Sequence, residues 1–155
     1  MKGRFERGGG AILPNNITEH GQEVLLKATL GVDSPGVFYL CLCDCTPSEA
    51  LQIEDLNEPT IGVGGYARIP IPLTPEGWPE SAVVAGVFSL LSLPCEFTPT
   101  DDGFDKPVGR LALVTDETAV AGNFVVCVST AFGPEELTPD TPAPDRTFRY
   151  RLFAK

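Results

Sequence analysis

The sequence predicts a mainly β protein: an antiparallel β-sandwich, of jelly-roll or Ig-like type, with one N-terminal helix packed against it. Three observations favour this fold class. Short apolar runs recur along the chain with turn residues between them, and only one segment has the spacing of an amphipathic helix. Glycine and proline, 16 and 15 of the 155 residues, suit many short strands and turns. The length and the 43% of hydrophobic residues suit one domain with its own core.

Residues 1–15 are expected to form a flexible N-terminal arm, and residues 16–155 the single domain. Three glycines at 8–10 indicate a hinge, and no periodic pattern surrounds them. The arm is basic in a chain of net charge −10, so it can seek an acidic partner while the body stays soluble. A chain end without a role is the alternative. The residues expected to contact the partner are the cations and apolar side chains of the arm: Arg4, Phe5, Arg7, Ile12 and Leu13.

Residues 16–31 have the pattern of a helix. Asn16 suits the N-cap, Glu19 the third helical position of a capping box, and Gly31 the C-terminal end. Gly21 interrupts the apolar side and costs about 1 kcal/mol relative to alanine. The helix should therefore need a larger body to pack against.

The remaining apolar runs are expected to be strands. Residues 66–73 alternate in side-chain character, and Pro70 and Pro72 restrict this segment to a sheet edge, because proline gives no N–H to a neighbouring strand. Residues 108–115 and 123–132 are expected to pair as a hairpin. Further strands are expected over 37–43, 81–93, 95–100 and the C-terminal end, where Phe148, Tyr150 and Leu152 alternate with Arg149 and Arg151, after a proline-rich exposed linker at 133–145.

Charge and hydropathy exclude several classes of partner. A net charge of −10 argues against non-specific nucleic-acid binding, which needs a basic face. No apolar run approaches the roughly 20 residues that span a bilayer, and the first apolar run is too short for a signal peptide. An odd number of cysteines, five, fits maturation in a reducing cytoplasm.

The spacing of Cys41, Cys43 and Cys45 raises the question of a metal site. Alternation in a strand puts the three sulfurs on one face. The tight pair spacing of a zinc knuckle is missing, so buried apolar thiols are the favoured interpretation and zinc the alternative.

The sequence predicts no enzyme, cofactor or metal site. Gly62, Gly64 and Ala67 fit a loose dinucleotide fingerprint, but the prolines that follow exclude the helix that it needs. His20 is the single histidine and has no nucleophile motif beside it. Residues 101–105 hold clustered carboxylates, but the segment is better explained as a turn than as a calcium loop.

The order of elements resembles a family of small tailed-bacteriophage virion proteins, described as tail-fibre-like or structural. The matching features are an opening N-x-x-E helix, "VFYLCLC" leading into "DCTPSEA", then "GGYAR", "VGRLALVTDETAVAGN" and a closing "DRTFRYRLF". The resemblance covers roughly residues 16–153, with "GGYAR" after "TPSEA" as its most specific part. The chain departs from it in the three cysteines and at 121–123, where the family has a double glycine.

The resemblance implies a non-enzymatic structural component of a tailed-phage virion, made in the cytoplasm of a bacterial host. An accessory capsid cement or decoration protein is the favoured role, and a tail, baseplate or fibre component the alternative. The expected partners are other virion proteins, the major capsid protein or tail proteins, and further copies of the chain, because proline-marked edges and a marginal helix suggest surfaces completed by neighbours.

Within "GGYAR", Tyr66 and Arg68 have two interpretations. They can meet a partner from one face, or Tyr66 can pack on the edge of the core while Arg68 pairs with a nearby carboxylate. A rival function is a carbohydrate or host-surface binding module, for which Trp78, Tyr66 and Tyr39 would supply aromatic platforms.

Overall fold

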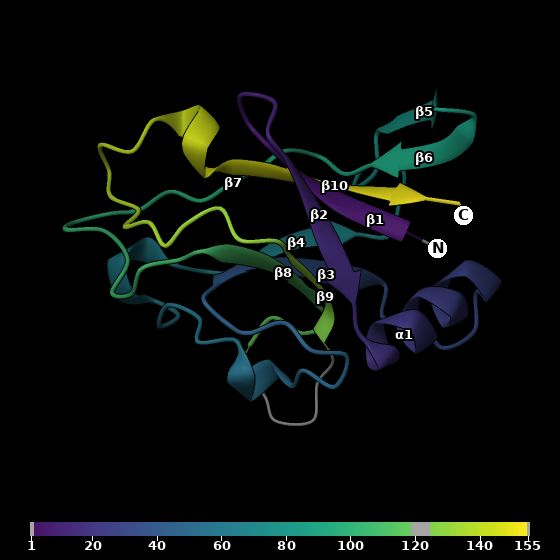
Figure 1. Ribbon diagram of the computed structural model, residues 1–155, viewed down its shortest axis with the longest axis horizontal. Coiled ribbons are helices and arrows are strands. Elements are labelled where there is room, and N and C mark those ends of the chain that lie inside the picture. The colour runs from purple at the N-terminus through teal and green to yellow at the C-terminus, as the bar shows by residue number, and fades with distance from the viewer. Residues whose placement is uncertain (1, 119–124, 155) are drawn as a thin grey trace.

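The computed structural model describes residues 2–118 and 125–154, and within them the chain is mainly β with one α-helix. Ten strands form one sheet in the order β4-β3-β8-β9-β2-β1-β10-β6-β5, and β7 pairs with β10 beside this path. Neighbouring strands are antiparallel throughout. Figure 1 shows the sheet curling round the core, with β2 running from the group of β1 and β10 to the group of β3, β8 and β9.

Most expected elements are present. The strands are β1 (Lys2–Arg7), β2 (Ile12–Ile17), β3 (Val37–Cys43), β4 (Ile69–Pro72), β5 (Glu80–Val84), β6 (Val87–Leu91), β7 (Cys95–Glu96), β8 (Arg110–Val114), β9 (Val125–Ser129) and β10 (Thr147–Phe153), and the helix is α1 (Glu19–Leu30). The pairing of β8 with β9 confirms the predicted hairpin. Residues 119–124 of its loop lie outside the described residues, and they include 121–123, where the chain departs from the phage family.

The prediction of a flexible arm over residues 1–15 is wrong. Strands β1 and β2 pair with each other, and β1 also pairs with β10 along its whole length. Phe5 points into the core with no exposed surface. Gly9 and Gly10 take φ values of 89° and 93° and let the chain turn between the two strands. The glycines thus form a hairpin turn, and the arm belongs to the domain.

Helix α1 begins later than predicted. Asn16 lies in β2, and Thr18 is the N-cap, its side chain accepting a hydrogen bond from the N–H of Gly21 at 2.8 Å. Gly31 ends the helix with φ of 66°, as expected. Gly21 packs against the backbone of Val126, where a β-carbon would overlap the carbonyl oxygen. The glycine that weakens the helix is therefore what lets it approach β9.

Strands β3, β8 and β9 are buried on both faces. One face contributes to the main core between the two groups of strands, and the other is covered by the loop that follows β3. This explains why their sequences are continuous apolar runs with little alternation. The loop side chains that cover the second face are Leu51, Ile53 and Leu56, each 4% exposed or less.

Three further segments differ in detail from the expectation. Strand β4 covers only Ile69–Pro72 of the predicted 66–73, and it does lie at an edge of the sheet. The predicted strand at 81–93 is two strands that turn at Ala85 and Gly86, both with positive φ. The linker at 133–145 is not simply exposed, because Leu137 is buried in the main core.

Among the described residues, no helix is long and apolar enough to cross a membrane.

Candidate functional site

The predicted site residues separate into two places. Tyr66 and Arg68 lie in a buried polar centre beside β3, whereas the N-terminal residues belong to the β1–β2 hairpin. Of the latter, Phe5 and Leu13 face the core, being 0% and 7% exposed, so the prediction that they contact a partner is wrong. Arg4 and Ile12 remain at the surface, whereas the Arg7 side chain is 12% exposed and packs on the rings of Phe132 and Phe148.

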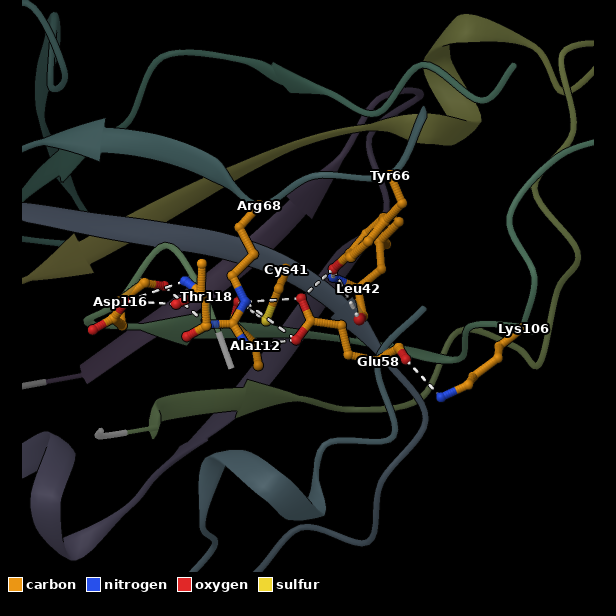
Figure 2. Close-up of polar contacts among 9 residues, drawn as sticks. All are labelled: Cys41, Leu42, Glu58, Tyr66, Arg68, Lys106, Ala112, Asp116 and Thr118. Carbon is orange, nitrogen blue, oxygen red and sulfur yellow. Dashed lines mark hydrogen bonds and ion pairs between the residues drawn. The ribbon is translucent and has the colours of Figure 1, made fainter. Parts of the chain in front are cut away.

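Glu58 is the hub of the buried polar centre (Figure 2). The guanidinium of Arg68 donates from Nε and Nη2 to the two oxygens of the Glu58 carboxylate, with Nε–Oε1 at 2.8 Å. Arg68 Nη1 donates to the carbonyl oxygens of Asp116 and Thr118, both at 2.9 Å. The hydroxyl of Tyr66 donates to Glu58 Oε1 at 2.7 Å and accepts from the N–H of Leu42 at 3.0 Å.

Burial dominates the electrostatics of this centre. The Arg68 side chain has no exposed surface and that of Glu58 is 8% exposed. Burial raises the pKa of the Tyr66 hydroxyl well above its ordinary value, and the nearby Glu58 adds to the rise. Burial lowers the pKa of Arg68, but the bond to Glu58 outweighs it and the net change is upward. Tyr66 therefore stays neutral and Arg68 charged, which suits structural hydrogen bonding.

This centre fastens loops to the sheet. It ties the segment around Glu58 to β3 through Leu42, and to the residues after β8 through Asp116 and Thr118. Gly64, at φ of 58°, packs so closely on Gly103 that a β-carbon would overlap its carbonyl oxygen. The interpretation of Tyr66 and Arg68 as a partner-binding pair is wrong, and the alternative of a core-edge tyrosine with a locally paired arginine is confirmed.

A second group of polar residues lies on the outer surface of β1 and β10. We call it the arginine face. It consists of Arg4, Arg149 and Arg151, whose three guanidinium groups share two carboxylates, because Glu6 bonds both Arg4 and Arg151, at 2.9 and 2.7 Å. The other pair is Arg149 with Glu80 at 2.6 Å. Arg7 is not part of this face: it lies opposite Phe148 in the register, its guanidinium lies over the rings of Phe132 and Phe148, and it pairs with Glu135 at 2.6 Å. An excess of positive charge thus lies on one face of a chain whose net charge is −10.

The arginine face borders exposed apolar surface. Ile12 is 54% exposed, and the Arg4 guanidinium lies 5.3 Å from the centre of the Phe153 ring. Beside these residues is a hollow of about 460 Å³ that Val84 and Val87 also line. Arginine and aromatic side chains together are enriched in protein interfaces, and arginine forks match carboxylates in two bonds.

Sequence reasoning found only part of this face. It placed Arg149 and Arg151 together on one side of the last strand, but nothing in the sequence indicates that this strand pairs with residues 2–7. The register brings Arg4 directly opposite Arg151 and Glu6 opposite Arg149. A contact between the two ends of a chain leaves no local pattern that a sequence can show.

Trp78 lines a separate apolar hollow of about 510 Å³ with Leu73, Phe88, Leu90 and Leu152 among its walls. Its ring packs edge-on against Tyr150, with centroids 6.2 Å apart, and its indole N–H is buried without a partner among the described residues. Tyr66 is buried elsewhere, and Tyr39 packs on the opposite face of β3. The three aromatic side chains therefore do not form one platform.

The cysteines are free thiols in or beside the core. Cys41 and Cys43 are fully buried, Cys45 is half-buried, and the sulfurs of Cys43 and Cys45 are 3.8 Å apart. This confirms the apolar-burial interpretation for the first two. Over residues 2–118 and 125–154, no group of three or more cysteine, histidine or acidic side chains is placed to hold a metal ion.

The other two candidates from the sequence stay apart from these surfaces. His20 is half-buried in the first turn of α1. Asp101 has φ of 54°, and the N–H of Gly103 bonds the carbonyl of Thr100 at 2.9 Å, so this acidic segment is a turn, as expected.

In comparisons with known proteins, no family model, curated protein or solved structure matches this chain.

Proposed function

We propose that this chain is a non-enzymatic structural component of a tailed-phage virion, and that the arginine face binds an acidic surface of another virion protein. The role that we favour is an accessory cement or decoration protein on the capsid exterior. The proposal joins two supports: the sequence resemblance to phage virion proteins and the placement of three arginines on one face of an acidic chain.

The observation that carries the binding role is the shared carboxylate of Glu6. Since Arg4 and Arg151 both bond the Glu6 carboxylate, a carboxylate of the partner can bond one of these arginines while Glu6 stays paired with the other, and no buried charge is left unpaired. Arg4 is the more accessible of the two, with 26% of its side chain exposed against 14%. Ile12 beside it offers apolar contact at the rim of the same surface.

The test is incorporation into particles. A phage that lacks its own copy of the gene for this protein is grown on cells that express the variant. The particles are purified, and the amount of the protein per particle is measured. We expect Arg4→Gln combined with Arg149→Gln to reduce occupancy, and raised salt to release the wild-type protein. The matched control is Lys27→Gln, which removes a cation from an exposed ion pair on α1. Equal occupancy for both variants contradicts the proposal, as does a wild-type protein that is absent from particles.

Two alternative functions are distinguished by the copy number in particles and by glycan binding. A tail, baseplate or fibre component would be present in far fewer copies than a decoration protein. A carbohydrate-binding module is favoured by one observation, the apolar hollow beside Trp78, and would show glycan binding that Trp78→Ala abolishes. We also propose that the curled sheet is a jelly-roll or Ig-like sandwich, an architecture that would suit either role.

A further inference from the structure

The two edges of the sheet differ in their ability to accept another strand. Strand β4 forms one edge, and the N–H of Leu73 bonds the carbonyl of Gly36, next to β3. Backbone groups alternate in direction along a strand, so Ile69 and Ile71 also face β3, and Pro70 and Pro72 face outward. Proline has no N–H, so this edge offers no outward donor and is closed to strand addition.

Strand β5 forms the other edge and has no such protection. The N–H of Ala154 donates to the carbonyl oxygen of Phe88, and the N–H of Ser92 donates to that of Tyr150, so the backbone groups of Phe88 and Ser92 face β10. The alternate residues of β6 therefore face β5, and by the register their partners are Glu80, Ala82 and Val84. The N–H and C=O groups of Ser81 and Val83 consequently point away from the sheet.

We infer that two copies of this chain join through β5, antiparallel, about a two-fold axis at Ala82. In this register Ser81 of each copy lies opposite Val83 of the other, and all the outward N–H and C=O groups of both residues find partners. The pair on the axis is alanine against alanine, which suits the closest approach of two strands. A continuous sheet of both copies results.

The side chains fit the same register. Val83 is 70% exposed and Phe88, its partner on β6, is 51% exposed. Ser81, Phe88 and Leu90 line the apolar hollow beside Trp78. Facing residues on paired strands project to the same side of a sheet, so Val83 of the second copy would extend over this hollow and bury it.

The charges also permit a second copy, although each chain carries −10. Glu80 is the single charged residue of β5, and it is already bonded to Arg149 at 2.6 Å. In the proposed register it faces Val84 of the second copy, and the two Glu80 residues lie four residues apart along the pair, about 14 Å. That separation exceeds the Debye length of about 8 Å at physiological salt. No like charges are brought together at this edge.

The pairing is tested by the association state of the purified protein. Sedimentation across micromolar to millimolar concentrations should show a monomer–dimer equilibrium. Val83→Pro removes only an outward donor, so it should leave the β5–β6 hairpin intact and weaken the dimer at least about tenfold. The control Val83→Thr keeps the N–H and the β-branched shape and should dimerise like the wild type.

A second measurement holds even if Val83→Pro disturbs folding. Ala82→Cys places two thiols together on the axis, and mild oxidation should link two chains covalently. Ala85→Cys, on the same hairpin but away from the axis, should not link, and the wild-type protein gives the background from its own cysteines. A wild-type monomer at all concentrations overturns the inference, as does a dimer in which cysteine at 82 fails to link. This inference stands apart from the proposed virion role, since a monomer could still decorate a particle.

Discussion

Replacing Arg68 with methionine tests the buried polar centre most severely. The change keeps most of the side-chain volume but removes a cation that has no exposed surface. It leaves the Glu58 carboxylate with Tyr66 as its remaining side-chain donor in this centre, and it takes a donor from the carbonyls of Asp116 and Thr118. The perturbation is therefore an uncompensated buried charge, with little change in packing.

The expected loss is large for one substitution. Breaking a buried ion pair by removing one partner costs about 3–5 kcal/mol. The carbonyls of Asp116 and Thr118 add little, because these residues are half-buried and exposed and water can replace the guanidinium. For a chain of this size, that loss corresponds to a fall of about 6–20 °C in the midpoint of thermal unfolding.

A double-mutant cycle separates the ion pair from side effects. Glu58→Gln alone leaves Arg68 buried without its carboxylate and should also cost several kcal/mol, whereas the double variant with Arg68→Met buries no net charge. The double variant should be more stable than the sum of the single losses by about 2–3 kcal/mol. Chemical denaturation followed by circular dichroism measures these free energies of unfolding.

The matched control is Lys27→Met, which removes the cation of the exposed Lys27–Glu23 pair and should leave the midpoint unchanged. A loss of less than about 1 kcal/mol for Arg68→Met, or single losses that simply add, would refute the reasoning that the centre fastens the loops to the sheet.

Three further predictions follow from other parts of the fold. Phe5→Ala should lower the free energy of unfolding by about 3–5 kcal/mol in denaturant unfolding, because the ring is fully buried and its centre lies 4.9 Å from that of Tyr150. A Phe5→Ala variant as stable as the wild type would instead support a flexible arm. Cys45 should be alkylated first in timed labelling followed by peptide mass spectrometry, because the hydrogen bond with Cys43 lowers its pKa, whereas burial raises the pKa of Cys95 to about 12; faster labelling of Cys95 would contradict this. Burial raises the pKa of Glu6, but hydrogen bonds from Arg151 and Arg4 outweigh it, so the folded pKa lies below 4.5. The stabilisation by Glu6 is thus present above pH 4.5 and lost as the pH falls below it, and Glu6→Gln should destabilise at pH 7 by more than at pH 3 in thermal unfolding.

The sequence predicted the features that depend on local patterns. The helix end at Gly31, the edge position of Pro70 and Pro72 and the apolar strand at 37–43 are each determined by a few neighbouring residues. The helix begins after Thr18 rather than after the predicted Asn16, because both residues are good N-caps and the pairing of β2 with β9 keeps Asn16 in a strand.

The features that sequence reasoning missed depend on contacts between distant segments. Gly8, Gly9 and Gly10 suit a hinge and a hairpin turn equally well, and only the pairing with residues 147–153 makes residues 2–7 a central strand. Glu58 was not identified because one carboxylate in a polar loop has no distinguishing pattern. Its importance comes from Arg68, ten positions away, which folds back onto it.

The copy number of this protein in purified particles tests the proposed function most directly. The phage whose genome encodes the chain is purified, and the protein is quantified by mass spectrometry against the major capsid protein. A capsid decoration role predicts an amount comparable with that of the capsid protein, whereas a tail role predicts a small fraction of it. Absence of the protein from particles would contradict a structural role in the virion.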